Sequence, residues 1–199
     1  MDTKTLRQQI RQQRRALSDS EREYASFLLC EQLASTKLFQ QSKHIAFYLP
    51  NDGEMDLTLL IQHAWQAGKH CYLPVLAEPN TKRLWFIPYT PETQLKPNRF
   101  GIPEPLHSRS TRLRKTLSLD LILMPLVAFD INGHRIGMGG GFYDRTLAFL
   151  KYRQQWHKPN LVGIAYEFQK QKQITTNPWD IPLQAIATEK TLYLSRKNK

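Results

Sequence analysis

The first forty residues have the spacing of polar and apolar side chains that is typical of two consecutive helices. Residues 4–16 are polar except for a thin apolar line, which predicts a basic helix with one narrow apolar side. Ser18 and Glu21 have the spacing of a capping box, which predicts the start of a second helix. In the first helix, the apolar line is Leu6, Ile10 and Leu17, and the basic side is Lys4, Arg7, Arg11 and Arg14. In the second helix, the expected apolar face is Tyr24, Phe27, Leu28 and Leu33.

Residues 44–75 have the pattern of a strand, a helix and a second strand. The run HIAFYLP at 44–50 is short and rich in β-branched and aromatic residues, and turn-forming residues at 51–53 close it. Asp56 is in position to cap a helix whose apolar residues recur at helical spacing from Leu57, and Gly68 is in position to end it. The run HCYLPV at 70–75 follows directly. This unit predicts neighbouring parallel strands joined by a right-handed crossover.

The second half of the chain alternates loops with short apolar runs. Residues 76–118 are rich in proline, so we expect one strand there, at 83–89 on a sheet edge, and otherwise ordered loop. The runs LDLILM at 119–124 and LVGIAY at 161–166 are almost entirely apolar, as buried parallel strands require. A helix is expected at 143–152, a last strand at 191–195 and a frayed basic tail at 196–199. Together these elements predict a single α/β domain with a mostly parallel sheet.

Composition narrows the class of protein without identifying a partner. The chain has 199 residues, 41% hydrophobic and 23% charged, which excludes disordered, collagen-like and disulfide-scaffold proteins. Its 28 Lys and Arg against 17 Asp and Glu give a formal charge of +11, which attracts nucleic acids, acidic lipids and polyanionic metabolites alike. Cys30 and Cys71 match no metal spacing and are expected to be reduced thiols, and the start of the chain lacks the apolar run of a signal peptide. We therefore expect a cytoplasmic protein that enters no membrane.

The segment NGHRIGMGGGFYDR at 132–145 is the strongest candidate for chemistry, because it holds five of the nine glycines between a buried strand and a helix. Free backbone N–H groups and the helix dipole at such a place favour an anion such as phosphate. Arg135 adds charge-assisted hydrogen bonds, and Asp144 is close enough to reach a magnesium ion that phosphates hold. The alternatives are a flexible turn for the glycines and a helix cap or a partner of the helix dipole for Asp144. The four glycines before the helix are Gly137, Gly139, Gly140 and Gly141.

Two further side chains lie near this predicted site. Glu54 follows the strand at 44–50, and ligands of open α/β sheets bind at the carboxyl ends of parallel strands. The alternative for Glu54 is an ordinary surface acid. His134 adjoins Arg135, and because the chain has no metal-binding histidine spacing, we interpret it as a surface residue.

The segment VAFDINGHRIGMGGGFYDR at 127–145 closely resembles the signature of the 5-formyltetrahydrofolate cyclo-ligase family. The resemblance extends to LR at 6–7, FYLPNDGEMD at 47–56, GKHCYLPV at 68–75, GIPEP at 101–105 and PWDIPLQAIATE at 178–189. It implies a three-layer α/β/α fold and an ATP-dependent conversion of 5-formyltetrahydrofolate to 5,10-methenyltetrahydrofolate, with release of ADP and phosphate and a requirement for Mg²⁺. It also implies that the γ-phosphoryl group of ATP moves to the formyl oxygen before N10 of the folate attacks.

Residue by residue, the resemblance implies a nucleotide loop, a folate pocket and a metal pair. Arg135 and Tyr143 look like catalytic residues, and Asp144 and Asp180 look like the magnesium carboxylates. For Glu54, our hypothesis is that it orients the pterin ring by hydrogen bonds. The implied ATP-binding residues are Thr3, Lys4, Arg7, Arg135, Gly137, Met138, Gly139, Gly140, Gly141, Phe142 and Tyr143, and the implied folate-binding residues are Arg7, Leu49, Glu54, Met138, Gly139, Gly140, Gly141 and Phe142.

Three positions depart from the family's usual pattern. Thr3 stands four residues before Arg7, where the family commonly has Lys, and Lys4 offers a cation three residues before it on the same helix side. Gly140 stands where some relatives have Lys, so phosphate contact would rest on backbone N–H groups and on the preceding arginine. Phe100 replaces a Trp of many relatives, which keeps a stacking surface without the indole N–H.

Two other functions stay open from the sequence alone. The charge of +11 suggests an RNA-binding protein, although the chain has neither an RRM-type aromatic signature nor a KH loop. A non-catalytic nucleotide sensor could share the fold, but the presence of Arg135, Asp144 and Asp180 together favours an enzyme. We expect ATP and 5-formyltetrahydrofolate, with or without a polyglutamate tail, as small-molecule partners, no specific nucleic acid, no membrane, and a monomer.

Overall fold

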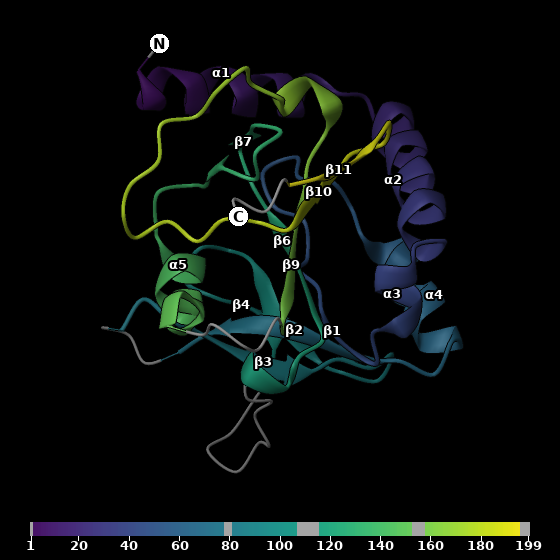
Figure 1. The fold of residues 1–199 in the computed structure, drawn as a ribbon. Coiled ribbons are helices and arrows are strands. Elements are labelled where there is room, and N and C mark those ends of the chain that lie inside the picture. Colours follow the sequence, from purple (N-terminus) through teal and green to yellow (C-terminus); the bar gives the residue numbers. More distant parts are fainter. Residues whose placement is uncertain (1, 78–80, 107–115, 153–157, 196–199) are drawn as a thin grey trace.

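Short apolar runs form a seven-stranded sheet in the computed structural model, which describes residues 2–77, 81–106, 116–152 and 158–195 (Figure 1). In sheet order the strands are β11 (Leu192–Leu194), β10 (Ala185–Ala187), β9 (Asn160–Ile164), β6 (Leu121–Pro125), β1 (His44–Ala46), β2 (His70–Leu76) and β3 (Leu84–Pro88). Every neighbouring pair from β10 to β2 is parallel, and the edge strands β3 and β11 are antiparallel to their neighbours. The mostly parallel sheet predicted from the sequence is therefore confirmed.

Helices cover both faces of this sheet, which gives three layers. The helices are α1 (Thr3–Ala16), α2 (Asp19–Ala34), α3 (Lys37–Gln41), α4 (Thr58–Gln66) and α5 (Phe142–Leu147). Ile45 of β1 packs in one apolar cluster with α2, α3 and α4, whereas the next residue, Ala46, packs in a second cluster with Leu147 of α5. Successive side chains of a strand point to opposite faces, so the sheet is buried on both sides. The single-domain α/β/α architecture agrees with the expectation.

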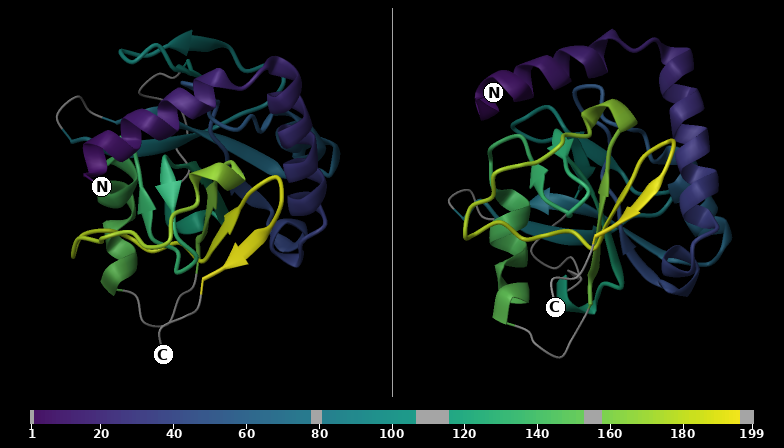
Figure 2. Two further views of the ribbon diagram at one scale, coloured as in Figure 1. Left: turned by 90° about the horizontal axis from the view of Figure 1, so that it is seen from above. Right: turned by 45° about the horizontal axis from the view of Figure 1, so that its top comes forward.

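The helix α1 does not belong to either layer. It lies above the sheet in Figure 1, and in the left view of Figure 2, seen from above, it crosses in front of the sheet between the side of α2 and the side of α5. Its inner side therefore faces the loops that leave the sheet rather than the sheet itself. Ile10 and Arg14 are the residues of α1 that become buried there.

The starts and ends of two helices follow the sequence closely. The Oγ of Ser18 accepts the backbone N–H of Glu21 at 3.3 Å, and the Glu21 carboxylate accepts the N–H of Ser18 at 2.8 Å, so the capping box is confirmed. The helix α4 begins at Thr58, and the carboxylate of Asp56 accepts its N–H at 2.8 Å. Asp56 thus supports this helix without being its cap residue. Gly68 follows the end of α4 with a φ of +67°, as predicted.

The buried side of α2 differs from the prediction. Tyr24 and Phe27 are 65% and 50% exposed, although their hydrophobicity suggested a buried face. Leu33 of the predicted face is buried, but otherwise the helix packs through Leu29 and two small residues, of which Ser26 donates a hydrogen bond to the carbonyl of Asp56 at 2.7 Å. Small residues let the helix lie close to its neighbours, which hydrophobicity alone does not reveal. The buried residues are Ala25, Ser26, Leu29 and Leu33.

Several short elements were not predicted. The segment expected to be loop contains the predicted edge strand β3 and also a two-stranded ribbon of β4 (Leu95–Pro97) and β5 (Pro103–Pro105), in which β5 contacts β2. The hairpin of β7 (Ala128–Phe129) and β8 (Arg135–Ile136) precedes the glycine loop. The helix expected at 143–152 is α5 followed by a 3₁₀ turn at Ala148–Tyr152. Parts of the expected loop, at 78–80 and 107–115, and the basic tail at 196–199 lie outside the described residues.

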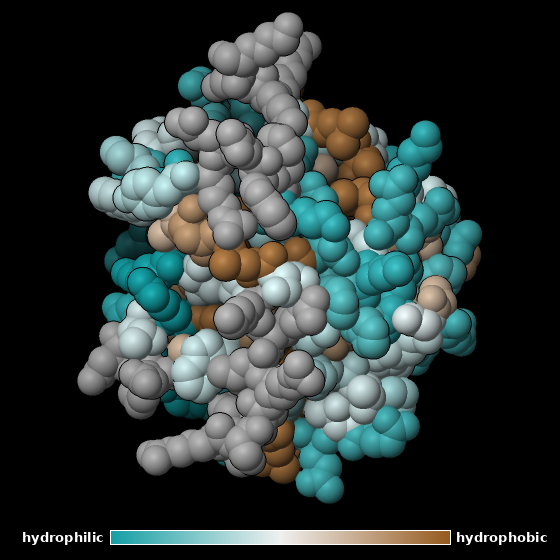
Figure 3. Space-filling model, turned by 60° about the horizontal axis from the view of Figure 1, so that its bottom comes forward, coloured by the Kyte–Doolittle hydropathy of each residue, from teal (hydrophilic) through white to brown (hydrophobic). Residues whose placement is uncertain are grey.

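On the face drawn in Figure 3, the described residues are mostly hydrophilic, and hydrophobic side chains form small separate patches. Within the part of the chain that the structure describes, no helix combines the length and the apolar character needed to cross a membrane.

Candidate active site

A cavity of about 930 Å³ lies between α1, the glycine loop and the carboxyl ends of β1, β2 and β6. This is the edge of a parallel sheet where ligands bind. Fourteen of the predicted ATP-binding, folate-binding, catalytic and metal residues line this cavity, although they come from four separate parts of the chain. Lys4 is not among the lining residues, whereas Thr3 is. The fourteen are Thr3, Arg7, Leu49, Glu54, Arg135, Gly137, Met138, Gly139, Gly140, Gly141, Phe142, Tyr143, Asp144 and Asp180.

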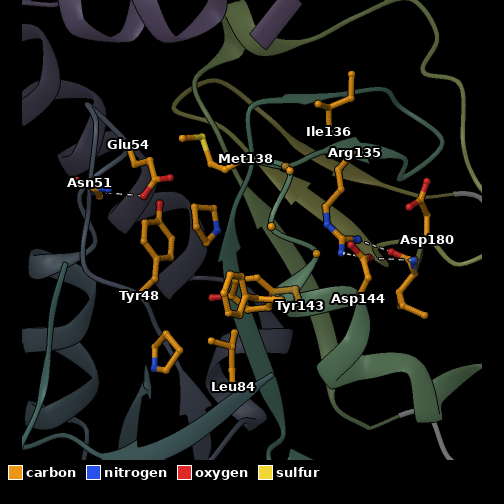
Figure 4. Close-up of a pocket in the computed structure, with 18 of the residues that line it drawn as sticks. Tyr48, Asn51, Glu54, Leu84, Arg135, Ile136, Met138, Tyr143, Asp144 and Asp180 are labelled. Atoms are coloured by element: carbon orange, nitrogen blue, oxygen red, sulfur yellow. Dashed lines mark hydrogen bonds and ion pairs between the residues drawn. The ribbon is translucent and has the colours of Figure 1, made fainter. Parts of the chain in front are cut away.

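The cavity has two chemically different sides, which Figure 4 shows in close-up. Met138 and Tyr143 lie between them. The first side carries Tyr48, Asn51 and Glu54, and the second carries Arg135, Asp144 and Asp180.

The glycine loop depends on backbone conformations that other residues rarely adopt. Gly139 and Gly141 have φ angles of +95° and +66°. A Cβ atom on Gly140 would lie 2.7 Å from the ring of Phe142. Gly139 and Gly141 therefore adopt backbone conformations that favour glycine, whereas a side chain at Gly140 would require the ring of Phe142 to move.

Two arginines hold the carbonyl groups of this loop. Arg7 Nε donates to the carbonyl of Gly137 at 2.9 Å, and Arg145 Nη1 donates to the carbonyl of Gly140 at 2.8 Å. Among the described residues, the N–H groups of 138–141 have no acceptor. Unused N–H groups beside two guanidinium groups form a site that suits an anion.

Arg135 and Asp144 form an ion pair on the second side of the cavity. Arg135 is 8% exposed, and its Nη2 lies 2.6 Å from Oδ1 of Asp144. Its Nη1 donates to the carbonyl of Ile181, and the N–H of Ile181 donates to the same Asp144 oxygen at 3.3 Å. These bonds link the glycine loop to the segment that carries Asp180. The cap residue of α5 is Gly141, so Asp144 is not the helix cap, but it lies in the first turn of α5, where an acid interacts favourably with the helix dipole.

Asp144 and Asp180 fit a magnesium ion only together with other oxygen ligands. One oxygen of Asp180 accepts the N–H of Asn177 at 2.7 Å, and one oxygen of Asp144 is paired with Arg135. Across the described ranges, no cluster of three or more His, Cys, Asp or Glu side chains could hold a metal by itself. Mg²⁺ usually takes one or two carboxylates and completes its six ligands with phosphate oxygens and water. The two carboxylates therefore suit a metal that arrives with a phosphate-bearing ligand.

Glu54 is the buried acid on the first side of the cavity. Its side chain is 10% exposed, so the alternative of an ordinary surface acid is wrong. One carboxylate oxygen accepts the N–H of Asn51 at 3.2 Å, and the other lies 3.8 Å from Nη1 of Arg14. Burial raises the pKa of Glu54 to about 7, and the charge of Arg14 opposes this rise. The carboxyl group of Glu54 is thus close to its titration point at neutral pH.

Two tyrosines adjoin Glu54 and stay neutral. Burial and the charge of Glu54 raise the pKa of both Tyr48 and Tyr143 above the ordinary value. The Tyr48 hydroxyl donates to the carbonyl of Met55 at 2.7 Å. Both phenols are therefore hydrogen-bond donors at neutral pH rather than bases.

Asp52 binds three arginines of α1 at once. Its carboxylate oxygens accept hydrogen bonds from Arg11 at 2.5 Å, from Arg14 at 3.0 Å and from Arg15. Partial burial alone would raise the pKa of Asp52. The hydrogen bonds from Arg11 and Arg15 have the larger combined effect and hold the pKa below its usual value. Asp52 thus gathers three arginines of α1 around one carboxylate, and most of the positive charge of this helix is left unbalanced.

His134 is not the plain surface residue that the sequence suggested. It lines the cavity, and its Nδ1 lies 3.0 Å from a carboxylate oxygen of the fully buried Asp130. The same oxygen accepts the N–H of Ile174 at 3.0 Å, so Asp130 ties the β7–β8 hairpin to the segment before Asp180.

Sequence reasoning also missed Trp179, which lines the cavity and is 65% exposed, and Arg145, which contacts the glycine loop. Both lie within the segments that carry the family resemblance. Their position in these segments was the only feature of the sequence that could have indicated a place in the site.

A parallel α/β sheet with a glycine loop and acidic side chains at the carboxyl ends of its strands is typical of enzymes that act on phosphate-bearing substrates. A profile of the 5-formyltetrahydrofolate cyclo-ligase family matches residues 1–189. The chain is 46% identical over 147 residues to a 5-formyltetrahydrofolate cyclo-ligase of Haemophilus influenzae, covering 72% of this chain and 74% of that protein. It is 39% identical over 184 residues to a protein of the same name from Escherichia coli, covering 90% of this chain and 96% of that protein.

Among solved structures, the 5,10-methenyltetrahydrofolate synthetase of Aquifex aeolicus matches with a TM-score of 0.81 and 32% identity, covering 100% of this chain and 95% of that one. The chain belongs to the 5-formyltetrahydrofolate cyclo-ligase family and is an enzyme of that family.

Proposed function

We propose that this enzyme converts 5-formyltetrahydrofolate to 5,10-methenyltetrahydrofolate with ATP as co-substrate, releasing ADP and phosphate. The observation that carries the proposal is the two-sided cavity, in which Glu54 and Tyr48 face Arg135, Asp144 and Asp180 across the glycine loop. One side suits the polar edge of a pterin and the other suits a polyphosphate. The names of the most similar relatives support the same reaction.

The ATP phosphates would bind at the glycine loop. The free N–H groups of 138–141 supply donors, while Arg7 and Arg135 supply positive charge on either side of the loop. Phosphoryl transfer depends on positioning and charge stabilisation more than on covalent help from a side chain. A rigid glycine loop that arginines hold in place meets that requirement.

Asp144 and Asp180 would hold Mg²⁺ together with phosphate oxygens and water. When bound there, the ion neutralises charge on the phosphates. Asp144 also keeps Arg135 in place, because the two side chains are paired at 2.6 Å.

The chemistry needs an activated formyl group, because its carbonyl is a poor electrophile and its oxygen a poor leaving group. In the proposed reaction the formyl oxygen forms a bond to the γ-phosphorus, and the bond from that phosphorus to ADP breaks. The lone pair of N10 then attacks the formyl carbon, the carbon–oxygen bond breaks with phosphate as the leaving group, and N10 loses its proton. The chain's part is to hold N10 next to that carbon and to exclude water.

Glu54 and Tyr143 would position the folate. An ionised Glu54 can accept two N–H donors from the ring edge of the pterin, which is the role hypothesised from the sequence. Tyr143 remains a neutral phenol because burial and Glu54 raise its pKa, so it can donate a hydrogen bond near the reacting atoms.

One assay tests this proposal directly. The purified protein is incubated with 5-formyltetrahydrofolate and Mg·ATP, and the absorbance of the methenyl product is followed. The proposal predicts product formation with stoichiometric ADP, and no product when ATP is omitted or the metal is chelated. Absence of the methenyl product under all conditions would contradict it.

A further inference from the structure

Arg14 is a buried cation whose hydrogen-bonding capacity is mostly unused. Its side chain is 1% exposed, and Nη2 donates to Asp52 at 3.0 Å. Within the described residues, its Nε and Nη1 have no hydrogen-bond partner. Burying a guanidinium with unpaired donors is costly. Holding α1 in place does not account for this cost, because Arg11 and Arg15 bind the same Asp52 from more exposed positions.

The unpaired Nη1 of Arg14 faces Glu54. The distance to the nearer carboxylate oxygen is 3.8 Å, which is an ion pair but too long for a hydrogen bond. Glu54 lines the cavity, whereas Arg14 is absent from its lining, so among the described residues the guanidinium lies behind the carboxylate as seen from the cavity. Any influence of Arg14 on a bound ligand therefore acts through Glu54.

We propose that Arg14 is a positioning residue for pterin recognition, whose buried guanidinium favours the ionised form of the Glu54 carboxyl and directs it into the cavity, where it accepts N–H donors of the ring. The identity of the ring rests on the proposed function. The electrostatic control of Glu54 by Arg14 does not rest on the proposed function, and it can be tested without a ligand.

The charged and titratable groups around Glu54 act in opposite directions. From α1, Arg14 and Arg11 favour its ionised form, and from its own loop Asp52 disfavours it. The remaining neighbours, Tyr48 and Tyr143, are neutral phenols. Burial leaves the pKa of Glu54 at about 7 even with Arg14 present. Because the ionised form is the one that accepts N–H groups, kcat/KM for the folate should fall as the pH drops through this pKa.

Two substitutions separate this role from a merely structural one. Arg14→Gln and Asp52→Asn both break the same Arg14–Asp52 contact, so a structural role predicts similar effects from both. The electrostatic role predicts opposite effects. Removing Arg14 should move the acid limb of kcat/KM for the folate up by about one to three pH units, the range expected when a close opposite charge is lost. Removing the charge of Asp52 should move it down.

Arg15→Gln is the matched control. Arg15 also binds Asp52, but its side chain is 60% exposed and it is not among the charged groups with the largest effect on Glu54. This variant loses one contact of α1 with Asp52. The acid limb of its kcat/KM for the folate should lie at the same pH as in the unaltered protein.

The readout that does not depend on turnover is the carboxyl carbon resonance of Glu54 in ¹³C-labelled, ligand-free protein, assigned by its loss in Glu54→Gln. Its titration midpoint should shift up in Arg14→Gln and down in Asp52→Asn. Shifts of the same sign in both variants, or no shift in either, would overturn the proposal. If Arg14→Gln does not fold, the Asp52→Asn variant alone tests the proposal. An upward shift of its titration midpoint, or no shift, would contradict the proposal. A protein without cyclo-ligase activity but with these opposite shifts would refute the proposed function and leave the control of Glu54 by Arg14 supported.

Discussion

Replacing Arg7 by Gln should weaken the apparent affinity for ATP by about 5- to 30-fold. Arg7 Nε donates to the carbonyl of Gly137 at 2.9 Å from a half-buried side chain, so it fixes the loop and places a positive charge beside it. A hydrogen bond that involves a charged group contributes about 1.5–3 kcal/mol. Partial exposure reduces this to roughly 1–2 kcal/mol. Since about 1.4 kcal/mol corresponds to a factor of ten, the stated range follows.

The assay is the KM for ATP at saturating folate, with Lys4→Gln as the matched control. Lys4 lies one turn earlier on α1, carries the same charge, is exposed and does not line the cavity. Its replacement should change the KM by less than about twofold, because exposed charges interact weakly. Raising the salt concentration should cancel the small effect of Lys4→Gln and leave most of the effect of Arg7→Gln.

Equal effects of the two substitutions would refute the reasoning. They would mean that α1 contributes only general positive charge and that the contact between Arg7 and the glycine loop is irrelevant to ATP.

Three further predictions follow from the site and the fold. Glu54→Gln should raise the folate KM or lower kcat while the KM for ATP stays the same, and unchanged folate kinetics in a steady-state assay would refute its role. Asp144→Asn and Asp180→Asn should each raise the Mg²⁺ concentration needed for half-maximal rate by about tenfold or more, and an unchanged Mg²⁺ titration would exclude the residue as a ligand. Gly133→Ala should lower the free energy of unfolding by about 1–3 kcal/mol, because Gly133 has a φ of +87° and a Cβ there would overlap Ser195. Urea denaturation measures this change, and an unchanged midpoint would contradict the conformation of that turn.

The central part of the fold could be predicted because its strands are buried on both faces. A strand such as β6 is almost wholly apolar, and the strand–helix–strand pattern at 44–75 admits few other arrangements. The failures have a common physical cause. The strand β10 has three residues and β4 and β5 contain prolines, so they form through pairing with neighbours rather than through local preference.

The face of α2 shows a second limit of sequence reasoning. Tyr24 and Phe27 are its largest apolar side chains, yet the buried residues are Ala25, Ser26, Leu29 and Leu33, of which only Leu33 was predicted. Close approach to a neighbouring helix favours small residues, and no property of a single helix indicates which neighbour it will meet.

In the candidate site, the predictable residues were those marked by their backbone geometry or by their position at the end of a strand. The glycine loop could be recognised from its composition, and Glu54 from its place after β1. Arg14 could not, because an arginine on a polar helix looks solvent-exposed until the loop that carries Asp52 and Glu54 is placed against it. The pairing of Arg135 with Asp144 was likewise invisible, since both residues were expected to face a ligand.

The central claim is that the free N–H groups of the glycine loop bind the phosphates of ATP beside the folate side of the cavity. Titrating ¹⁵N-labelled protein with magnesium and a non-hydrolysable ATP analogue, and following the backbone amide resonances, tests this claim most directly. The largest saturable shifts should fall on Gly137, Met138, Gly139, Gly140 and Gly141. Saturable shifts that leave these five amides unchanged and cluster elsewhere on the chain would contradict the account.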